Sequence, residues 1–231
     1  MQILNIAAYK LHILSELEIL RENLLKQCQQ FMLKGTILLS EEGINLNLSG
    51  WIENINAFKT YLVKDNCFAD LSFRESYSDT ISFKRLKVRI KKEIITMNYP
   101  GIHPEKTRAP SIMPEKLKQW LDEKRDLVLL DTRNEFEISF GTFNNAVNLH
   151  LQHFSEFPLA IKSLQCEKPI VMFCTGGIRC EKAALAMLNQ GFSEVYQLEG
   201  GILNYFSKMG GAHYQGKCFV FDERVALKPD R

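Results

Sequence analysis

The 231-residue sequence has no hydrophobic run of membrane-spanning length and no closely spaced CxxC pair among its six cysteines. Residues 1–6 have neither the basic start nor the cleavage pattern of a signal peptide. Scattered cysteines fit a reducing compartment better than a disulfide framework, and Cys28, Cys67 and Cys166 stand in contexts typical of structural residues. We therefore expect a cytoplasmic protein that does not associate with membranes.

Cofactor motifs are also missing. No G-x-G-x-x-G follows a strand pattern, so the sequence does not predict a dinucleotide site. His150 and His153 are spaced like half of a metal site, but no matching Cys or His pair stands elsewhere. We predict no metal site and no evident cofactor.

The chain as a whole has almost no excess of positive or negative charge, since its formal net charge is +2. No global field therefore draws the protein to nucleic acid. Residues 84–108 nevertheless hold eight basic and two acidic side chains. The strand pattern of residues 87–91 places Lys87, Arg89 and Lys91 on one face, next to Lys84 and Arg85. Such a strand is typical either of a solvated sheet face or of a surface that follows a phosphate backbone.

Residues 1–98 follow the order strand, helix, strand, strand, helix, strand, which predicts a ferredoxin-like α+β domain. The first helix is expected to begin at Ser15, because Ser15-x-x-Glu18 matches a capping box. The expected strands cover residues 2–9, 35–40, 44–48 and 86–94, and the second helix covers 51–63.

Residues 99–114 contain four prolines and are predicted to be an extended linker. From residue 115 to 212, strand and helix patterns alternate, which predicts an α/β domain with a parallel sheet and helices on both faces. Ligands of such sheets bind at the carboxyl ends of the strands. The expected strands cover 126–131, 146–149, 170–173 and 195–198, the helices 115–123, 154–163, 180–190 and 202–209, and the tail 213–231.

The most informative segment is CTGGIRCEKAA, residues 174–184, between a buried strand pattern and a helical one. A cysteine at this junction lies where backbone amides converge and the helix dipole favours negative charge. Glycines allow the loop of Thr175, Gly176, Gly177, Ile178 and Arg179 to curl, and the arginine adds positive charge. These surroundings lower a thiol pKa and predict a reactive thiolate at Cys174. The loop is one residue shorter than that of cysteine phosphatases, so it suits a single sulfur atom better than a tetrahedral oxyanion.

Cys-x4-Arg on a strand–loop–helix resembles the active loop of rhodanese sulfurtransferases, which carry a cysteine persulfide. The segment from Asp131 through Arg133 and Glu137 resembles the first rhodanese signature. Asp131 and Arg133 are expected to orient the loop through charge-assisted hydrogen bonds, or else to form a surface ion pair. For Glu137 both interpretations stand equally. Cys180 either resolves an oxidised or persulfidated Cys174 or simply packs.

Further segments occur in an order that resembles the tRNA uridine(34) hydroxylase family over nearly the whole chain: GTILLSEEGINLNLSG, DTRNEFE, GTF, FSEFP, CTGGIRCEKA, QLEGGILNY and CFVFDERV. The resemblance implies oxygen-dependent formation of 5-hydroxyuridine at the wobble base of certain tRNAs. It implies Cys174 as the persulfide-forming residue, molecular oxygen as co-substrate, the tRNA anticodon arm as partner and a persulfide donor. The motifs carry no information on oligomeric state.

Two alternatives stay open from the residues. The first is a sulfurtransferase that moves persulfide sulfur to a thiol or an RNA. The second is a rhodanese-like binding module without turnover, against which the intact Cys174 and Arg179 argue.

Overall fold

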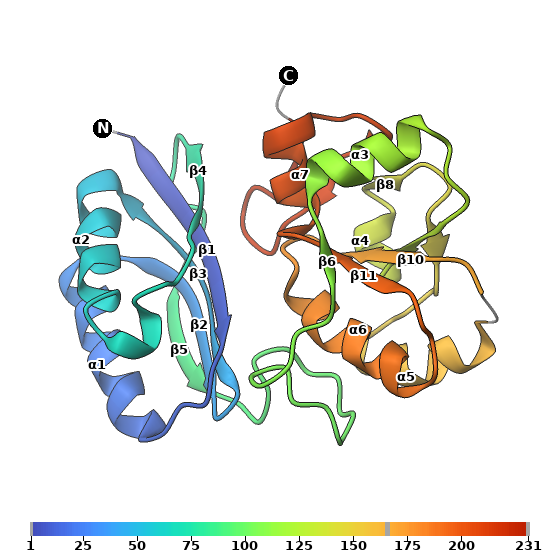
Figure 1. Cartoon of the computed structure of the whole chain (residues 1–231). Helices are drawn as coiled ribbons and strands as arrows, with labels where there is room; N and C mark the ends of the chain where they lie inside the picture. Colours follow the sequence, from blue (N-terminus) through green and yellow to red (C-terminus); the bar gives the residue numbers. More distant parts are fainter. Residues whose placement is uncertain (1, 165–166, 230–231) are drawn as a thin grey trace. The chain divides into compact units, whose positions relative to one another are not determined.

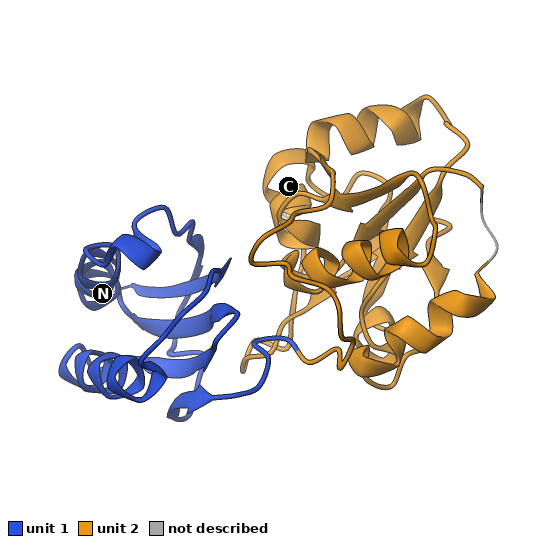
Figure 2. Cartoon of the chain, turned by 60° about the horizontal axis from the view of Figure 1, so that its bottom comes forward, with its two compact units in different colours: residues 1–95 blue, residues 96–231 orange. Residues whose placement is uncertain are grey.

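The computed structural model describes residues 2–164 and 167–229 (Figure 1). Cys166, expected to be structural, lies outside these residues. The chain forms two compact units, residues 1–95 and 96–231 (Figure 2). The segment predicted as a linker and the tail after residue 212 both belong to the second unit. None of the described helices is both long and apolar enough to cross a membrane.

The first unit is a five-stranded sheet with two helices on one face, in the strand order β4-β1-β3-β2-β5 (Figure 1). All neighbours are antiparallel except β2 and β5, which are parallel. Alternate residues such as Ile37, Leu39 and Leu46 are fully buried under the helices, which explains the alternating sequence pattern. The elements are β1 (Ile3–Leu11), α1 (Leu17–Gln30), β2 (Lys34–Ser40), β3 (Gly43–Trp51), α2 (Ile52–Leu62), η1 (Asn66–Phe68), β4 (Arg74–Ser78) and β5 (Leu86–Ile90).

The ferredoxin-like architecture is confirmed, but two local predictions are wrong. Helix α1 begins at Leu17, after Glu16 in a left-handed conformation, and no side chain caps it. The strand that completes the motif beside β1 is β4, and β5 is a fifth strand that ends at Ile90. Strand β4 was missed because its sequence, RESYS, has none of the apolar alternation that marks a half-buried strand.

The second unit is built on a parallel sheet in the order β6-β11-β10-β7-β9 (Figure 1). Helices α3 and α7 cover one face, and α5 and α6 lie on the other. The parallel α/β class is therefore confirmed. The elements of the sheet and its helices are β6 (Ser111–Ile112), α3 (Pro114–Asp122), β7 (Val128–Asp131), α4 (Glu135–Ile138), β9 (Val147–Asn148), α5 (Phe157–Ala160), β10 (Ile170–Phe173), α6 (Ile178–Asn189), β11 (Val195–Leu198) and α7 (Gly201–Met209).

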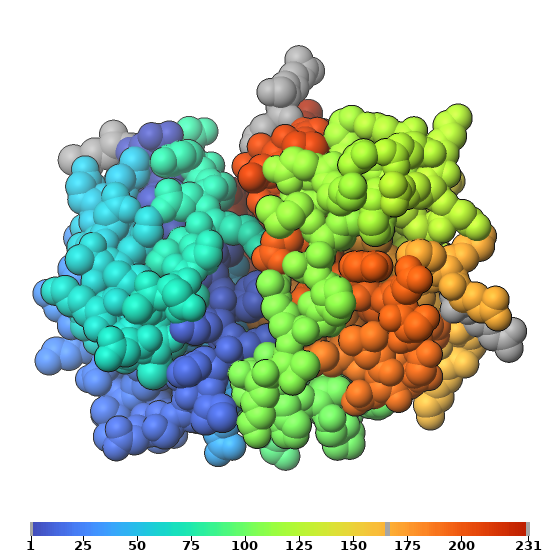
Figure 3. All heavy atoms as spheres, viewed as in Figure 1, coloured from blue at the N-terminus to red at the C-terminus, as the bar shows by residue number. Residues whose placement is uncertain are grey.

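The helix predicted over residues 154–163 is divided into η2 (Phe154–Glu156), α5 and η3 (Ile161–Ser163). Pro158 lies in the first turn of α5, where a helix tolerates a missing N–H. Proline cannot stand in the interior of a helix, so a single helix cannot run through this position. Residues beyond 212 pack onto this unit. His213 hydrogen-bonds to Asp122 of α3 at 2.7 Å. In Figure 3 the orange-red atoms of α7, the helix before this segment, lie directly beside the green atoms of α3. The remaining strands form two antiparallel pairs: β8 (Gly141–Phe143) with β12 (Tyr214–Gly216), and β13 (Cys218–Phe219) with β14 (Ala226–Leu227).

Candidate active site

Cys174 follows the central strand β10 directly, and its loop leads into α6. Gly177 turns the chain with φ +98°, a conformation that favours glycine, and α6 starts at the next residue. The Cys174 side chain is only 1% exposed, whereas Thr175 and Gly176 are half-buried at the outer edge of the loop. The Cys174 sulfur therefore lies under a loop whose tip meets solvent.

Backbone amides converge on the Cys174 sulfur, as the sequence predicted. The Gly177 N–H donates to Sγ at 3.0 Å. Burial alone raises the pKa of Cys174, but a hydrogen bond from Cys180, the charge of Arg179 and the amides of Arg179 and Gly177 together outweigh burial and lower the pKa. A lowered pKa makes Cys174 a thiolate near neutral pH, which is the reactive form.

Cys180 lies against the Cys174 sulfur from the first turn of α6. Burial and the neighbouring Cys174 raise the pKa of Cys180 well above that of an ordinary thiol. Its sulfur also lies 3.6 Å from Thr132 Oγ1, which in turn donates to the Phe173 carbonyl at 3.0 Å. Cys180 is thus a protonated thiol that donates to the thiolate.

Arg179 is tied by a buried ion pair to Glu137 of α4. One guanidinium nitrogen donates to Glu137 Oε1 at 2.9 Å and the other to Oε2, and the side chains are 6% and 0% exposed. Glu137 also accepts the Asn134 N–H at 3.2 Å. Arg179 therefore acts on the thiolate through its charge and its amide, and its terminal nitrogens hold Glu137.

Asp131 and Arg133 form a second buried ion pair, with Nη2 2.6 Å from Oδ2. Their further hydrogen bonds reach β8: Arg133 donates to the Gly141 carbonyl at 2.7 Å, and Thr142 Oγ1 donates to Asp131 at 2.7 Å. The hydrogen bonds described for Asp131 and Arg133 thus tie β7 to β8 and do not reach residues 175–179, where the sequence placed their role. Thr132, between them, bonds instead to Phe173 and Cys180, on either side of the active loop. The sequence pattern did not single out Thr132.

Helix α7 supports the loop from the other side, a role that the sequence analysis missed. The Ile202 and Leu203 amides donate to the carbonyls of Cys174 and Thr175 at 2.9 and 3.1 Å. Gly201 permits this approach, since a Cβ there would lie 2.4 Å from the Cys174 carbonyl oxygen. The only signal in the sequence is the pair of glycines between the last strand and helix.

Gly201→Ala is expected to displace the active loop. Gly191→Ala is a matched control, because Gly191 also has positive φ but its added Cβ meets nothing within 4 Å. Both variants lose about 1–2 kcal/mol from the left-handed conformation, and Gly201→Ala loses a further ~1–3 kcal/mol through steric overlap. Urea unfolding and alkylation of Cys174 measure the two effects. Equal behaviour of the two variants would show that the contact with α7 does not position the loop.

The lowered pKa of Cys174 predicts thiolate absorbance at neutral pH. An ordinary thiol titrates near pH 8.5, so about 97% of it is protonated at pH 7. The difference in ultraviolet absorbance between the wild type and Cys174→Ser should persist at neutral pH and vanish as pH falls through the lowered pKa. Cys67→Ser, which removes a half-buried thiol of the first unit, should leave this difference in place. Absorbance that grows in only near pH 8.5 would contradict the assignment.

The basic residues lie in the first unit on and around the edge strand β5. Lys87 and Arg89 are exposed and Val88 is buried beneath the helices, as the alternation predicted. Lys84, Arg85 and Lys91 are also exposed. Arg108 belongs to the second unit, where it bridges Glu181 at 3.1 Å and Glu199 at 2.8 Å.

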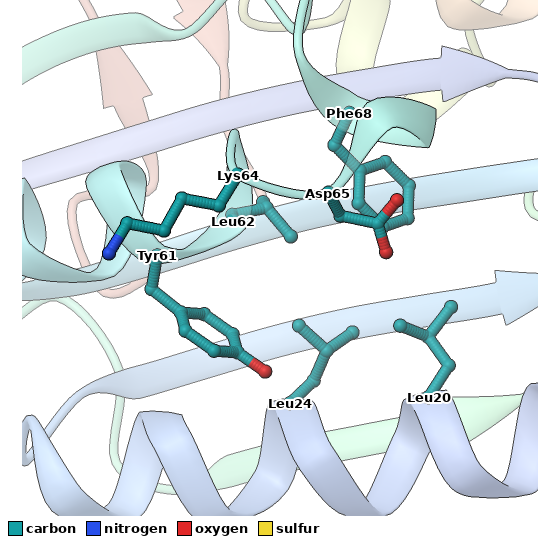
Figure 4. A pocket seen from close by; sticks show the side chains of 7 residues that line it. All are labelled: Leu20, Leu24, Tyr61, Leu62, Lys64, Asp65 and Phe68. Carbon is teal, nitrogen blue, oxygen red and sulfur yellow. The ribbon is translucent and has the colours of Figure 1, made fainter.

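The first unit also contains a pocket of about 240 Å³ between α1 and α2 (Figure 4). Its polar groups are the Tyr61 hydroxyl, Lys64 and Asp65, and the remaining lining is apolar. It contains no thiol.

His150 pairs with Glu135 at 2.7 Å. Within residues 2–164 and 167–229, no three His, Cys, Asp or Glu side chains are grouped as metal ligands.

The second unit, with a thiolate loop at the end of a central parallel strand, has the features of a rhodanese domain. Residues 113–208 match the model of the rhodanese-like domain, and residues 3–94 match that of the UPF0176 acylphosphatase-like domain. Similar solved structures include a rhodanese-related protein from Thermoplasma volcanium, at 26% identity over 44% of this chain and 94% of that one, with a TM-score of 0.39.

Relatives over the full length identify the family. Proteins named tRNA uridine(34) hydroxylase from Cupriavidus pinatubonensis and Ralstonia nicotianae are 54% and 53% identical, and each match covers 100% of this chain and 84% of the relative. The one from Bordetella petrii is 49% identical over 98% of this chain and 93% of its own. The chain therefore belongs to the tRNA uridine(34) hydroxylase family, as its motifs indicated, and is an enzyme with a rhodanese domain.

Proposed function

We propose that this protein hydroxylates the wobble uridine of tRNA to 5-hydroxyuridine with molecular oxygen, and that Cys174 is its nucleophile and persulfide carrier. The observation that carries the proposal is the lowered pKa of the Cys174 thiolate in a chain of this family. An enzyme that modifies tRNA acts where tRNA is, so we infer a cytoplasmic location.

The Cys174 thiolate can attack the outer sulfur of a persulfide donor. The new S–S bond forms on Cys174 and the donor's S–S bond breaks, so the donor leaves as a thiolate. The Gly177 amide and the charge of Arg179 stabilise negative charge at this position before and after transfer. The Cys180 thiol can donate a hydrogen bond to the same sulfur. It can also resolve the persulfide by attacking Cys174 Sγ, which forms a Cys174–Cys180 disulfide and releases the outer sulfur as hydrogen sulfide.

Hydroxylation places one atom of molecular oxygen on C5 of uridine, and the other atom is reduced to water. The balance needs two electrons and two protons, which we assign to a reductant of the thiol class. Oxidation of two thiols to one disulfide releases these two electrons and two protons. When Cys174 carries no persulfide sulfur, the buried Cys174 and Cys180 are such a pair; their oxidation forms one disulfide, which two equivalents of an external thiol reduce again.

Strand β5 supports contact with the phosphates of the anticodon arm. Its exposed Lys87 and Arg89 alternate with the buried Val88, so their side chains leave the sheet on the face opposite the helices. Cations at alternate positions of a strand match the spacing needed along a phosphate backbone, and they position RNA without reading its sequence.

Mass spectrometry of tRNA nucleosides tests the proposal. Deletion of the gene should remove 5-hydroxyuridine, whereas loss of thiouridine instead would support sulfur transfer. With purified protein, ¹⁸O₂ should label the new hydroxyl and H₂¹⁸O should not. The reverse labelling would refute the oxygen dependence.

The same assay separates binding from chemistry. Lys87→Gln with Arg89→Gln should raise KM for tRNA and flatten its salt dependence while kcat holds, because the two cations release counterions from phosphate. Lys162→Gln is the control, because it removes a lysine that lies outside β5, on η3 of the second unit, and it should leave KM unchanged.

A further inference from the structure

Three phenylalanines are exposed in the part of the chain that the structure describes, and all three lie in one cluster. Phe136, Phe140 and Phe221 are 46%, 38% and 62% exposed. Each packs on Phe219, with ring centroids 5.2, 5.3 and 5.0 Å away, and Phe136 and Phe221 meet it edge to face. We call these four residues the phenylalanine cluster. A contiguous aromatic surface left in solvent marks a binding site more often than a scattered apolar residue does.

The phenylalanine cluster adjoins the active loop. The Phe219 carbonyl accepts a hydrogen bond from Thr175 Oγ1 at 3.3 Å, so the residue after Cys174 is bonded directly to the cluster. Phe136 precedes Glu137, whose carboxylate holds Arg179. Phe140 is joined through its carbonyl to the Lys217 N–H at 2.8 Å, and the Lys217 side chain is exposed.

The exposure of Phe221 is built into a rigid turn. The Val220 N–H donates to the Val225 carbonyl at 2.8 Å, and the Val225 N–H donates to the Asp222 carbonyl at 3.0 Å. Asp222 also accepts Arg224 Nε at 2.8 Å. Val225 has φ +64°, a conformation that costs a β-branched residue energy and persists only where surrounding bonds hold it. The turn thus presents a fixed aromatic ring to solvent.

We propose that the phenylalanine cluster is a stacking platform for the unpaired nucleobases that flank the target uridine in the anticodon loop. This inference rests on the proposed function, because it takes tRNA as the substrate. A base drawn to a buried cysteine must leave its stack, and aromatic side chains next to the site can replace the lost stacking for its neighbours.

The chemistry of the cluster favours bases over other ligands. Phenylalanine offers π-faces and no hydrogen-bond donor, so it stacks any base and reads none. Lys217, whose backbone bonds to Phe140 and whose side chain is exposed, supplies a positive charge that can attract the phosphates of the same nucleotides. The platform therefore holds the anticodon loop in place, and recognition of the uridine is left to other groups of the protein.

The test uses the full-length protein, an anticodon stem-loop RNA and whole tRNA. Phe221→Ala should weaken stem-loop binding about thirtyfold, the middle of the range found for one base–aromatic stack. Phe221→Trp should restore binding, and Phe221→Leu should not, because leucine keeps an apolar surface without a π-face. Leu159→Ala, an equally exposed apolar change on α5, should bind as the wild type does.

Photo-crosslinking locates the contact independently of turnover. Stem-loops with 5-iodouridine beside the wobble position should crosslink to the phenylalanine cluster. Crosslinks elsewhere with unchanged binding of Phe221→Ala would overturn the inference. Equal binding by Phe221→Leu and the wild type would overturn it too, because an apolar surface without a π-face would then be enough. Wild-type protein that binds and crosslinks the RNA here but forms no 5-hydroxyuridine would instead refute the proposed function alone.

Discussion

Cys174→Ser is expected to abolish formation of 5-hydroxyuridine, with a fall of about 10³-fold or more, the scale seen when a catalytic nucleophile is removed. Serine is nearly the same size, so the loop can keep its hydrogen bonds from Gly177 and α7. Its hydroxyl has no accessible anionic form at neutral pH and cannot carry a persulfide. The loss is therefore chemical and leaves the fold in place.

The measurement is the yield of 5-hydroxyuridine by nucleoside mass spectrometry under identical tRNA and oxygen supply. Cys67→Ser controls for removal of a thiol, since Cys67 lies in η1 of the first unit and is half-buried. It should retain full activity. Circular dichroism and tRNA binding should match the wild type for both variants. If Cys174→Ser kept activity within a few-fold of the wild type, Cys174 would not be the nucleophile.

Cys180→Ser tests whether the thiol that lies against Cys174 takes part in the reaction. Serine still donates a hydrogen bond to the Cys174 thiolate, so any loss of activity reports the sulfur chemistry of Cys180. A variant with normal single turnover but slow multiple turnover would assign Cys180 to resolving Cys174. In the structure the two sulfurs are joined by a hydrogen bond. The sequence, in which they are six residues apart, allowed this contact but equally allowed Cys180 simply to pack.

Features of the site that are local in sequence were predictable. Cys174, Gly177 and Arg179 follow one another on a strand–loop–helix, so their backbone geometry follows from local preferences. The basic face of β5 was equally visible, because alternation along a strand is a local property.

Contacts between distant segments were not predictable from one sequence. Arg179 and Glu137 are 42 positions apart, and nothing in either segment says which carboxylate the arginine meets. Gly201 lies under the Cys174 carbonyl through the packing of α7 on the loop. Such contacts depend on how helices dock on the sheet, and local pattern does not encode that docking.

The buried pair of Arg179 and Glu137 carries the largest expected effect on stability. Glu137→Gln leaves the Arg179 guanidinium buried at 6% exposure without a counter-charge. Breaking such a pair costs about 3–5 kcal/mol of unfolding free energy. Glu135→Gln is the matched control on the same helix, since its carboxylate is 42% exposed beside His150, and it should cost less than about 1 kcal/mol.

Urea unfolding can be followed in the second unit alone. The chain has two tryptophans, Trp51 in the first unit and Trp120 in the second, so a Trp51→Phe background leaves Trp120 fluorescence as the reporter. A decrease below about 1 kcal/mol for Glu137→Gln would mean that water or another group takes over the charge of Arg179.

Removal of both partners separates the structural role of the pair from its chemical one. Glu137→Leu with Arg179→Met replaces the ion pair by apolar side chains, which is often neutral or stabilising when both charges leave together. Stability should therefore recover relative to Glu137→Gln. The pKa of Cys174 should nevertheless rise, because the Arg179 charge that helps to lower it is gone, while the hydrogen bonds from Cys180 and the backbone amides stay. A double variant that is stable, yet whose thiolate absorbance appears only at a higher pH than in the wild type, would show that Glu137 serves stability by pairing with Arg179 and that the Arg179 charge lowers the pKa of Cys174.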